Sequence, residues 1–352
     1  MKANMDKRKM LMILAIVALA GFTVFVIVGG KDYAERILIG LAISIVLAVS
    51  LNLFSGFTGL FSLGQVGFMA IGAYASSILT LPLAMKAANL PDLPVWLASI
   101  EMPFLPATLL AGSLAACVAF LVGIPLMRLI GPYVSVATMG FLVITQVVLT
   151  NADTFTRGSR TFAGVSGHTT LLNAWLWAAI SVYFVLRMKY SSFGRAMRAS
   201  RDNVIAAQSI GIDVVRQRLL AFCASAFLTA VGGALWAHFI RAFSPKSFYF
   251  TQTFSVITMV VIGGLGSVRG SILGVFFVTI LSEVLRNLER GFSLGPVTVP
   301  SMYGASQVIM ALILILIIVF RPGGMMGESE TSLEALVKRF RKAGTKAGLK
   351  KE

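Results

Sequence analysis

SSFGRAMRASRDNVIAAQSIGIDVVRQR, residues 191–218, is a polar and basic segment inside an otherwise apolar chain. Five arginines lie between Arg195 and Arg218, and only Asp202 and Asp213 offset them. The segment separates two sets of long apolar runs. Its positive charge predicts that it lies on the cytoplasmic side of a membrane. The orientation of every other apolar run follows from this assignment.

The composition indicates a membrane protein. Of the 352 residues, 57% are hydrophobic and 12% are charged, whereas soluble domains carry roughly 25% charged residues. Several apolar runs are close to 20 residues long, the length that spans a bilayer as a helix. Only helices and closed barrels satisfy backbone polar groups in lipid, and these runs do not alternate as barrel strands do. The sequence therefore predicts an all-α polytopic membrane protein.

About ten transmembrane helices are expected, with eight to ten as the range. With the N-terminus inside, the cytoplasmic pieces carry 21 of the 30 Lys and Arg residues, so both termini are expected to be cytoplasmic. The divisions are a cytoplasmic N-terminus at 1–9, a membrane domain at 10–320 that includes the cytoplasmic loop 187–218, and a basic cytoplasmic tail at 321–352. The expected spans are 10–29, 36–53, 62–82, 105–127, 132–150, 171–186, 219–239, 251–268, 270–287 and 302–320.

Two segments outside the spans have distinct patterns. The loop 83–106 contains four prolines and is interpreted as an extended extracytoplasmic connection. In the tail, Thr331-Ser332-Leu333-Glu334 fits a capping box. Apolar residues then recur at helical spacing among basic ones, which favours an amphipathic helix on the membrane surface, with a merely solvated tail as the alternative. The net charge of +16 is explained by these membrane-flanking segments, so no nucleic-acid partner is expected.

Two glycine-interrupted apolar segments lie in opposite halves of the chain, at 55–73 and 262–277. Transporters place such broken helices around a substrate site, where freed backbone groups line a cavity. Close helix packing through small residues is the alternative. The candidate pathway residues are Asn52, Ser62, Gly64, Gln65, Gly263, Gly264 and Gly266.

Motifs for catalysis are missing from the sequence. There is no G-x-x-x-x-G-K-[ST], H-E-x-x-H or G-x-S-x-G pattern. Cys117, Cys223, His168 and His238 are isolated, so no metal site is expected. Glu283 is the one acid well inside a span, and Arg286 three residues on can neutralise it. A transport pathway without its own energy source predicts a partner.

The basic segment has the pattern of a short helix. Asp202 can cap it, 203–210 fit two turns, and Gly211 fits the left-handed position just past its end. Ala206 and Ala207 give it a smooth side for a partner protein. A positively charged topology loop with an incidental helix is the alternative.

This short helix and several other segments resemble those of a known family. Ala206-Ala207 and Gly211 match the E-A-A-x-x-x-G element with which ABC importer permeases dock into their ATPase subunit, although Ile205 stands at the acidic position. Five segments are similar to the LivM-type branched-chain amino-acid permeases: NLFSGFTGLFSLGQVGFMAIGAYAS, RLIGPYVSVATMGF, RAMRASRDNVIAAQSIGIDVVRQRLLAFCASAFLTAVGGALWA, VIGGLGSVRGSILG and FRPGGMMG. Together they run from about Ile37 to Gly327.

The resemblance implies a multi-subunit importer in the inner membrane. It would contain this permease, a second related permease, two ATPase subunits and an extracytoplasmic solute-binding protein. This chain would bind no ATP, metal or other cofactor itself and would not be an enzyme. The coupling residues would be Arg198, Arg201, Asp202, Asn203, Ala206, Ala207 and Gly211. Branched-chain or other hydrophobic amino acids are the expected substrates. Urea or short amides are the alternative, and a self-sufficient secondary carrier or channel is a further one.

Overall fold

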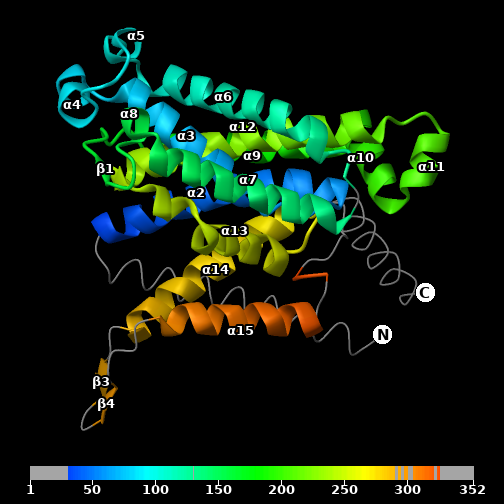
Figure 1. The fold of residues 1–352 in the computed structure, drawn as a ribbon. Helices are drawn as coiled ribbons and strands as arrows, with labels where there is room; N and C mark the ends of the chain where they lie inside the picture. The colour runs from blue at the N-terminus through cyan, green and yellow to red at the C-terminus, as the bar shows by residue number, and fades with distance from the viewer. Residues whose placement is uncertain are drawn as a thin grey trace, which may run out of the picture.

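The computed structural model describes residues 31–129, 131–289, 292–294, 297–299, 304–320 and 323–325. Over these residues the chain is a bundle of α-helices with two small two-stranded sheets (Figure 1). This arrangement confirms the predicted all-α membrane fold. The expected span at 10–29, the N-terminus at 1–9, and the amphipathic helix in the tail lie outside the described residues.

Helix α2 (Lys31–Leu51) is the central helix, and it continues into the short π-helix η1 (Asn52–Gly56). Of its most apolar window, 83% is buried inside the protein. A helix that is apolar on every side belongs in the middle of a bundle. Accordingly α2 packs against α9 (Leu171–Tyr190), α12 (Val214–Ile240) and the C-terminal helices described below.

One layer beside α2 consists of α3 (Gln65–Thr80), α6 (Phe104–Leu126) and α12. Small residues let these helices approach closely. A methyl group on Gly72 would overlap the backbone of Ala230, and one on Gly233 would overlap the Met69 carbonyl. The α3–α12 contact is therefore one of backbone against backbone.

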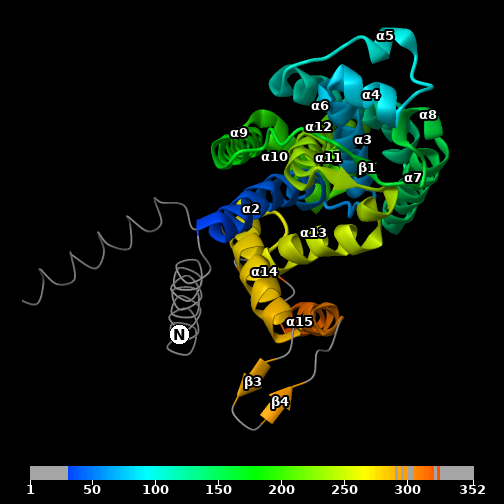
Figure 2. The ribbon, with the colours of Figure 1, turned by 90° about the vertical axis from the view of Figure 1, so that its left-hand side faces the viewer.

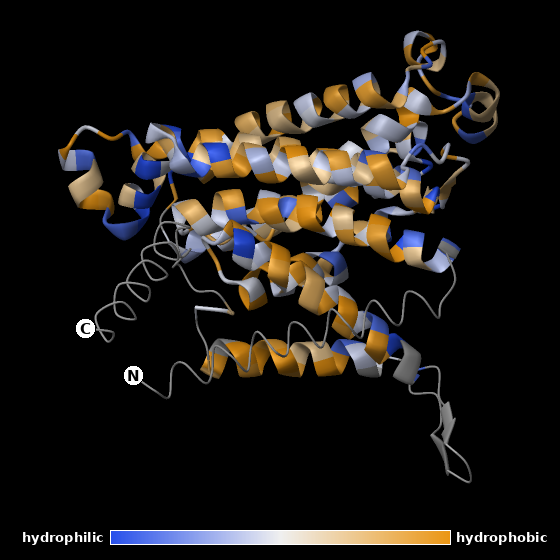
Figure 3. Cartoon of the chain, turned by 180° about the vertical axis from the view of Figure 1, so that it is seen from behind, coloured by the Kyte–Doolittle hydropathy of each residue, from blue (hydrophilic) through white to orange (hydrophobic). Residues whose placement is uncertain are grey.

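The outer helices present apolar surface to lipid. In α6, α7 (Pro132–Asn151) and α9, only about a third or less of the apolar window is buried, from 28% to 33%. Hydrophobic residues run along these helices (Figure 3), and many of their large apolar side chains are exposed. Exposed leucine, valine and phenylalanine side chains on these helices are what a lipid-facing surface requires.

The C-terminal helices lie on the other side of α2 (Figure 2). They are α13 (Phe250–Gly263), α14 (Val268–Glu289) and α15 (Ala305–Phe320). Strands β3 (Phe292–Leu294) and β4 (Val297–Val299) pair antiparallel between α14 and α15.

The two ends of the bundle differ in construction (Figure 1). Helices α10 (Ser192–Asp202) and α11 (Val204–Ser209) protrude at one end. At the other end, β1 (Phe162–Ala163) pairs with β2 (Ala242–Phe243). The short elements around this pair are α4 (Leu83–Asn89), α5 (Val95–Ala98), α8 (Asp153–Thr156) and the 3-10 helix η2 (Pro245–Phe248).

The loop 83–106 is not the extended connection that its prolines predict. Pro82 and Pro94 each precede the first residue of a short helix, α4 and α5. The buried Lys86 ammonium donates to the carbonyls of Leu97 and Ile100 and so joins α4 to α5 and to the segment after it. Burial lowers the pKa of Lys86, and the charge of Glu101 opposes part of that shift.

Nine helices of the described chain overlap the nine expected spans that fall within it. Six of them are long and apolar enough to cross a membrane. Helices α3 and α13 have only 16 and 14 residues, fewer than the roughly 20 that span a bilayer. The count of ten transmembrane helices is therefore not confirmed.

Candidate functional site

The protruding helices α10 and α11 are each capped by a side chain. The Ser191 hydroxyl accepts a hydrogen bond from the Gly194 amide at the start of α10. At the start of α11 the Asn203 side-chain oxygen accepts from the Ala206 amide at 3.0 Å. The predicted cap was Asp202, which is instead the last residue of α10. The N-cap of α11 is therefore one residue later than predicted, because Asp202 belongs to the last turn of α10.

The end of α11 matches the sequence prediction. Gly211 has φ +83°, in the left-handed region. The Ile212 amide donates to the Ala207 carbonyl at 3.1 Å, and the Gly211 amide donates to the Gln208 carbonyl at 2.9 Å. These two bonds form a Schellman motif, in which glycine avoids the clash of a Cβ atom.

Helix α11 exposes apolar side chains at the tip of this protrusion. Ile205 and Ile210 are 76% and 75% exposed. Ala206 is exposed between them, whereas Ala207 is buried. Apolar side chains exposed on a short helix at a bundle end form a surface that another protein can cover.

The base of the protrusion is bonded to the first broken helix. Arg201, on the last turn of α10, donates to the Gly56 carbonyl at 2.8 Å. The Lys189 ammonium donates to the Gly266 carbonyl at 3.0 Å and lies 5.7 Å from the centre of the Phe57 ring. Both glycine-interrupted segments are thus attached to the helices that carry α11.

The two glycine-interrupted segments meet each other at Asn52, whose side chain is fully buried. Its amide nitrogen donates to the Ser267 carbonyl at 2.9 Å and to the Ser271 hydroxyl at 2.8 Å. Its amide oxygen accepts from the Gly266 amide at 2.8 Å. A methyl group on Gly56 would overlap both Asn52 and Gly266.

The other predicted pathway residues of the first segment face a different interface. A methyl group on Gly64 would overlap the Thr138 carbonyl of α7. The Gln65 amide donates to the hydroxyls of Ser225 and Thr229 on α12, at 2.5 Å each. Ser62 is buried in the same stretch, and its amide donates to the Ser55 hydroxyl at 3.2 Å. The predicted pathway residues therefore lie at two interfaces: Asn52 contacts the second broken segment, whereas Gly64 and Gln65 contact α7 and α12.

In the second segment, Gly263 and Gly264 lie at the end of α13. Gly263 is packed against the backbone of Gly270, and Gly264 ends the helix with φ +115°. The backbone of Gly324 lies against Gly264. Close packing is thus the observed role of these glycines, and a role in lining a substrate pathway stays a prediction.

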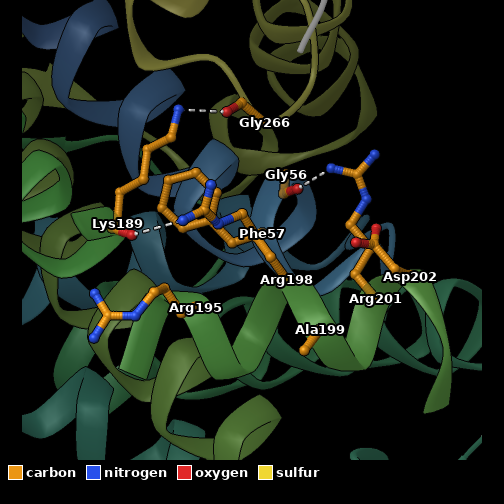
Figure 4. A pocket seen from close by; sticks show the side chains of 9 residues that line it. All are labelled: Gly56, Phe57, Lys189, Arg195, Arg198, Ala199, Arg201, Asp202 and Gly266. Carbon is orange, nitrogen blue, oxygen red and sulfur yellow. Dashed lines mark hydrogen bonds between the residues drawn. The ribbon is translucent and has the colours of Figure 1, made fainter. Parts of the chain in front are cut away.

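A cavity of about 430 Å³ opens where the base of α10 meets the two broken segments (Figure 4). The predicted coupling residues Arg198, Arg201 and Asp202 line it. Sequence reasoning did not single out Lys189, Arg195 or Phe57 at this place. The signal available was a lysine at the end of an apolar span, two residues before the basic segment. The cavity wall consists of Gly56, Phe57, Lys189, Arg195, Arg198, Ala199, Arg201, Asp202 and Gly266.

Glu283 has the local partner that its sequence context indicates. Arg286, one turn further along α14, donates to its carboxylate, and the Tyr33 hydroxyl of α2 donates to the same oxygen. The acid is thereby neutralised at the α2–α14 contact. Within the described residues, no three His, Cys, Asp or Glu side chains gather in a way that could hold a metal ion.

The fold and this junction define a class of protein. Membrane-spanning helices, two broken helices joined at a buried amide, and a protruding loop bonded to that junction are the parts of a multi-pass membrane permease. Residues 33–320 match the family model described as the permease component of branched-chain amino acid transport systems. The chain belongs to this family.

Individual relatives agree with the family assignment. The chain is 28% identical to the LivM permease of the Escherichia coli high-affinity branched-chain amino acid transport system, over 93% of this chain and 77% of that protein. A probable LivM of Methanocaldococcus jannaschii is 24% identical, over 84% of this chain and 94% of that protein. The Escherichia coli LivH permease is 26% identical, over 53% of this chain and 62% of that protein.

Proposed function

We propose that this chain is a permease subunit of an ATP-driven importer in the inner membrane, and that it moves branched-chain or other hydrophobic amino acids inward. The family membership and the likeness to LivM proteins support this substrate class. The chain itself carries out transport rather than catalysis and binds neither ATP nor another cofactor. Both termini and the α10–α11 protrusion face the cytoplasm.

The partners are a second homologous permease, two ATPase subunits and an extracytoplasmic solute-binding protein. The observation that carries the proposal is the exposed apolar surface of α11, which is bonded at its base to both broken helices. An ATPase subunit that covers Ile205 and Ile210 can transmit its movement through Arg201 to Gly56. This mechanism gives the basic segment at 191–218 its function.

Charge placed on the α11 surface tests this docking. Because Ile205 and Ile210 are exposed, Ile205→Glu with Ile210→Glu should leave the permease folded while the ATPase subunits no longer copurify with it. The matched control is Val95→Glu, since Val95 is an apolar residue that is 85% exposed at the other end of the bundle. Copurification of ATPase subunits with both variants alike would contradict the proposal.

The substrate is tested in the same preparation. The assembled complex in vesicles is given labelled leucine, isoleucine, valine or urea, and uptake is measured with and without ATP. We expect uptake of the three amino acids that depends on ATP and on the binding protein. Uptake of urea alone, or uptake by the isolated chain along an ion gradient, would replace the proposal with one of its alternatives.

A further inference from the structure

The short helix α5 presents an apolar surface at the end of the bundle opposite to α10 and α11. Val95 is 85% exposed and Trp96 is 66% exposed. The stretch from Leu93 to Ile100 contains no charged residue. An exposed tryptophan with apolar neighbours is typical of the boundary between lipid and water, where this residue type is enriched.

This surface lies where the lipid-facing side of α6 begins. Figures 1 and 2 both place α5 at the outer edge of the bundle, at the end where α6 starts. On α6, Leu105 is 59% exposed and Leu110 is 48% exposed. Helix α6 has 23 residues and is therefore about 34 Å long, slightly more than the roughly 30 Å of a hydrocarbon core. Its first turn thus reaches the headgroups, and residues 99–103 join it there to α5.

Internal donors satisfy backbone carbonyls of α5. The buried Lys86 ammonium donates to the Leu97 carbonyl at 3.2 Å. Ser99 donates through its amide to the Val95 carbonyl at 3.1 Å, and through its hydroxyl to the Trp96 carbonyl at 3.2 Å. In water, solvent can bond the carbonyls at the end of a helix. In contact with lipid, the protein has to supply the donors, and α5 is built in this way.

Both ends of α5 are fastened to the bundle. Before the helix, Leu90 and Leu93 are 3% and 7% exposed and belong to the hydrophobic core. After it, the Met102 amide donates to the Leu79 carbonyl of α3 at 2.9 Å. A contact that holds α5 therefore also holds the end of α3.

We propose that α5 is an interfacial anchor, which embeds Val95 and Trp96 among the phospholipid headgroups on its side of the membrane. The partner of this surface is the lipid itself. The anchor fixes the depth of α3, whose 16 residues are fewer than the roughly 20 that span a bilayer. The proposal concerns the position of the chain in the membrane and does not depend on its substrate or its ATPase partners.

Tryptophan fluorescence tests the lipid contact without a label. The full-length chain is placed in nanodiscs of brominated phosphatidylcholine, and the emission that is lost in Trp96→Phe is assigned to Trp96. Bromine near the headgroup should quench this emission more than bromine near the end of the acyl chain. The control is Trp236→Phe, since the Trp236 ring packs inside the bundle, 5.1 Å from the Phe248 ring between centroids, and should be quenched little. Trp96 emission that brominated lipid leaves unchanged would overturn the proposal.

A dye at Val95 gives a second measurement. It is attached in a full-length chain with Cys117→Ala and Cys223→Ala, and melting temperatures establish that the variants are folded. At Val95→Cys an environment-sensitive dye should emit at shorter wavelength, and be quenched less by iodide, than at Asp92→Cys. Asp92 is exposed in the turn between α4 and α5. Equal emission and equal quenching at the two positions would refute insertion. Protection from iodide that appears only when the solute-binding protein is added would assign the surface to protein docking instead.

Discussion

At the scale of single residues, Asn52 is the buried polar side chain that joins the two broken segments. Its one side chain makes three hydrogen bonds to α14 and to the loop before it, with partners more than 200 positions away in sequence. In a low-dielectric interior, leaving such partners unpaired costs about 1–3 kcal/mol for each group. Asn52 therefore holds the two broken segments in register.

Asn52→Ala should loosen this junction. The variant leaves the Gly266 amide without its partner and removes the amide that donates to the Ser267 carbonyl and the Ser271 hydroxyl, so we expect a destabilisation of about 2–3 kcal/mol. Thermal unfolding in detergent and hydrogen exchange at Gly266 measure the effect. The control is Asn151→Ala, since Asn151 is exposed and its amide donates only to Val147 of its own helix. A melting temperature equal to that of the control would contradict the role of Asn52.

At the scale of elements, the start of α15 is capped by a residue of α14. Glu289 accepts hydrogen bonds through one carboxylate oxygen from the Ser306 amide at 2.7 Å and from the Ser306 hydroxyl at 2.8 Å. A carboxylate at a helix N-terminus also interacts favourably with the helix dipole. The cap joins two helices across the β3–β4 hairpin.

This cap should depend on pH. Hydrogen bonds from the Ser306 amide, and then from its hydroxyl, lower the pKa of Glu289 below its usual range. A lowered pKa stabilises the folded state above the unfolded pKa, and the contribution disappears as the pH falls through the folded value. At pH 7 the parent should therefore melt above Glu289→Gln, and the difference should be smaller at about pH 3, below the usual glutamate pKa of about 4.3.

The pH experiment needs a control for a general change in charge. Glu35→Gln removes an exposed acid from α2 and should melt at the temperature of the parent at both pH values. A Glu289→Gln variant that melts with the parent at pH 7 would show that the cap contributes nothing.

The elements were predictable to different degrees. The length of the apolar runs located the spans, and the spacing to Gly211 identified the end of α11, because both depend on local sequence. The prediction of an extended chain for the loop 83–106 was wrong, because Pro82 and Pro94 each precede a short helix. The two helices are joined by the hydrogen bond from the buried Lys86 to the Leu97 carbonyl. The basic cavity could not be predicted from the sequence. It depends on Lys189 meeting Gly266 across 77 positions, which no local pattern records.

At the scale of the whole molecule, Arg201 connects the protruding loop to the buried core. Arg201 links the base of α11 to Gly56, and Gly56 lies against Asn52 and Gly266. Movement of α10 therefore reaches the contact between the two halves of the bundle in two steps. Under the proposed function this is the route by which ATP hydrolysis drives transport.

Arg201→Ala should uncouple the two processes. The ATPase subunits should still copurify, because the α11 surface is unchanged, but amino acid uptake per ATP hydrolysed should fall roughly tenfold with the loss of a charged hydrogen bond. Arg216→Ala is the control, since Arg216 is exposed at the start of α12 and does not line the cavity. Equal losses of coupling in both variants would exclude a specific role for Arg201.

The hydrogen bonds of Asn52 cannot form until much later in the synthesis of the chain. Ser271 lies 219 positions after Asn52, and ribosomes add roughly 5–20 residues per second. The Asn52 side-chain amide of η1 therefore enters the bilayer about 10–45 seconds before its final partner is synthesised. During that interval, water at the membrane surface or the insertion machinery has to satisfy it. Asn52 is thus a buried polar group that has to stay hydrogen-bonded to other partners until the C-terminal half of the chain is made.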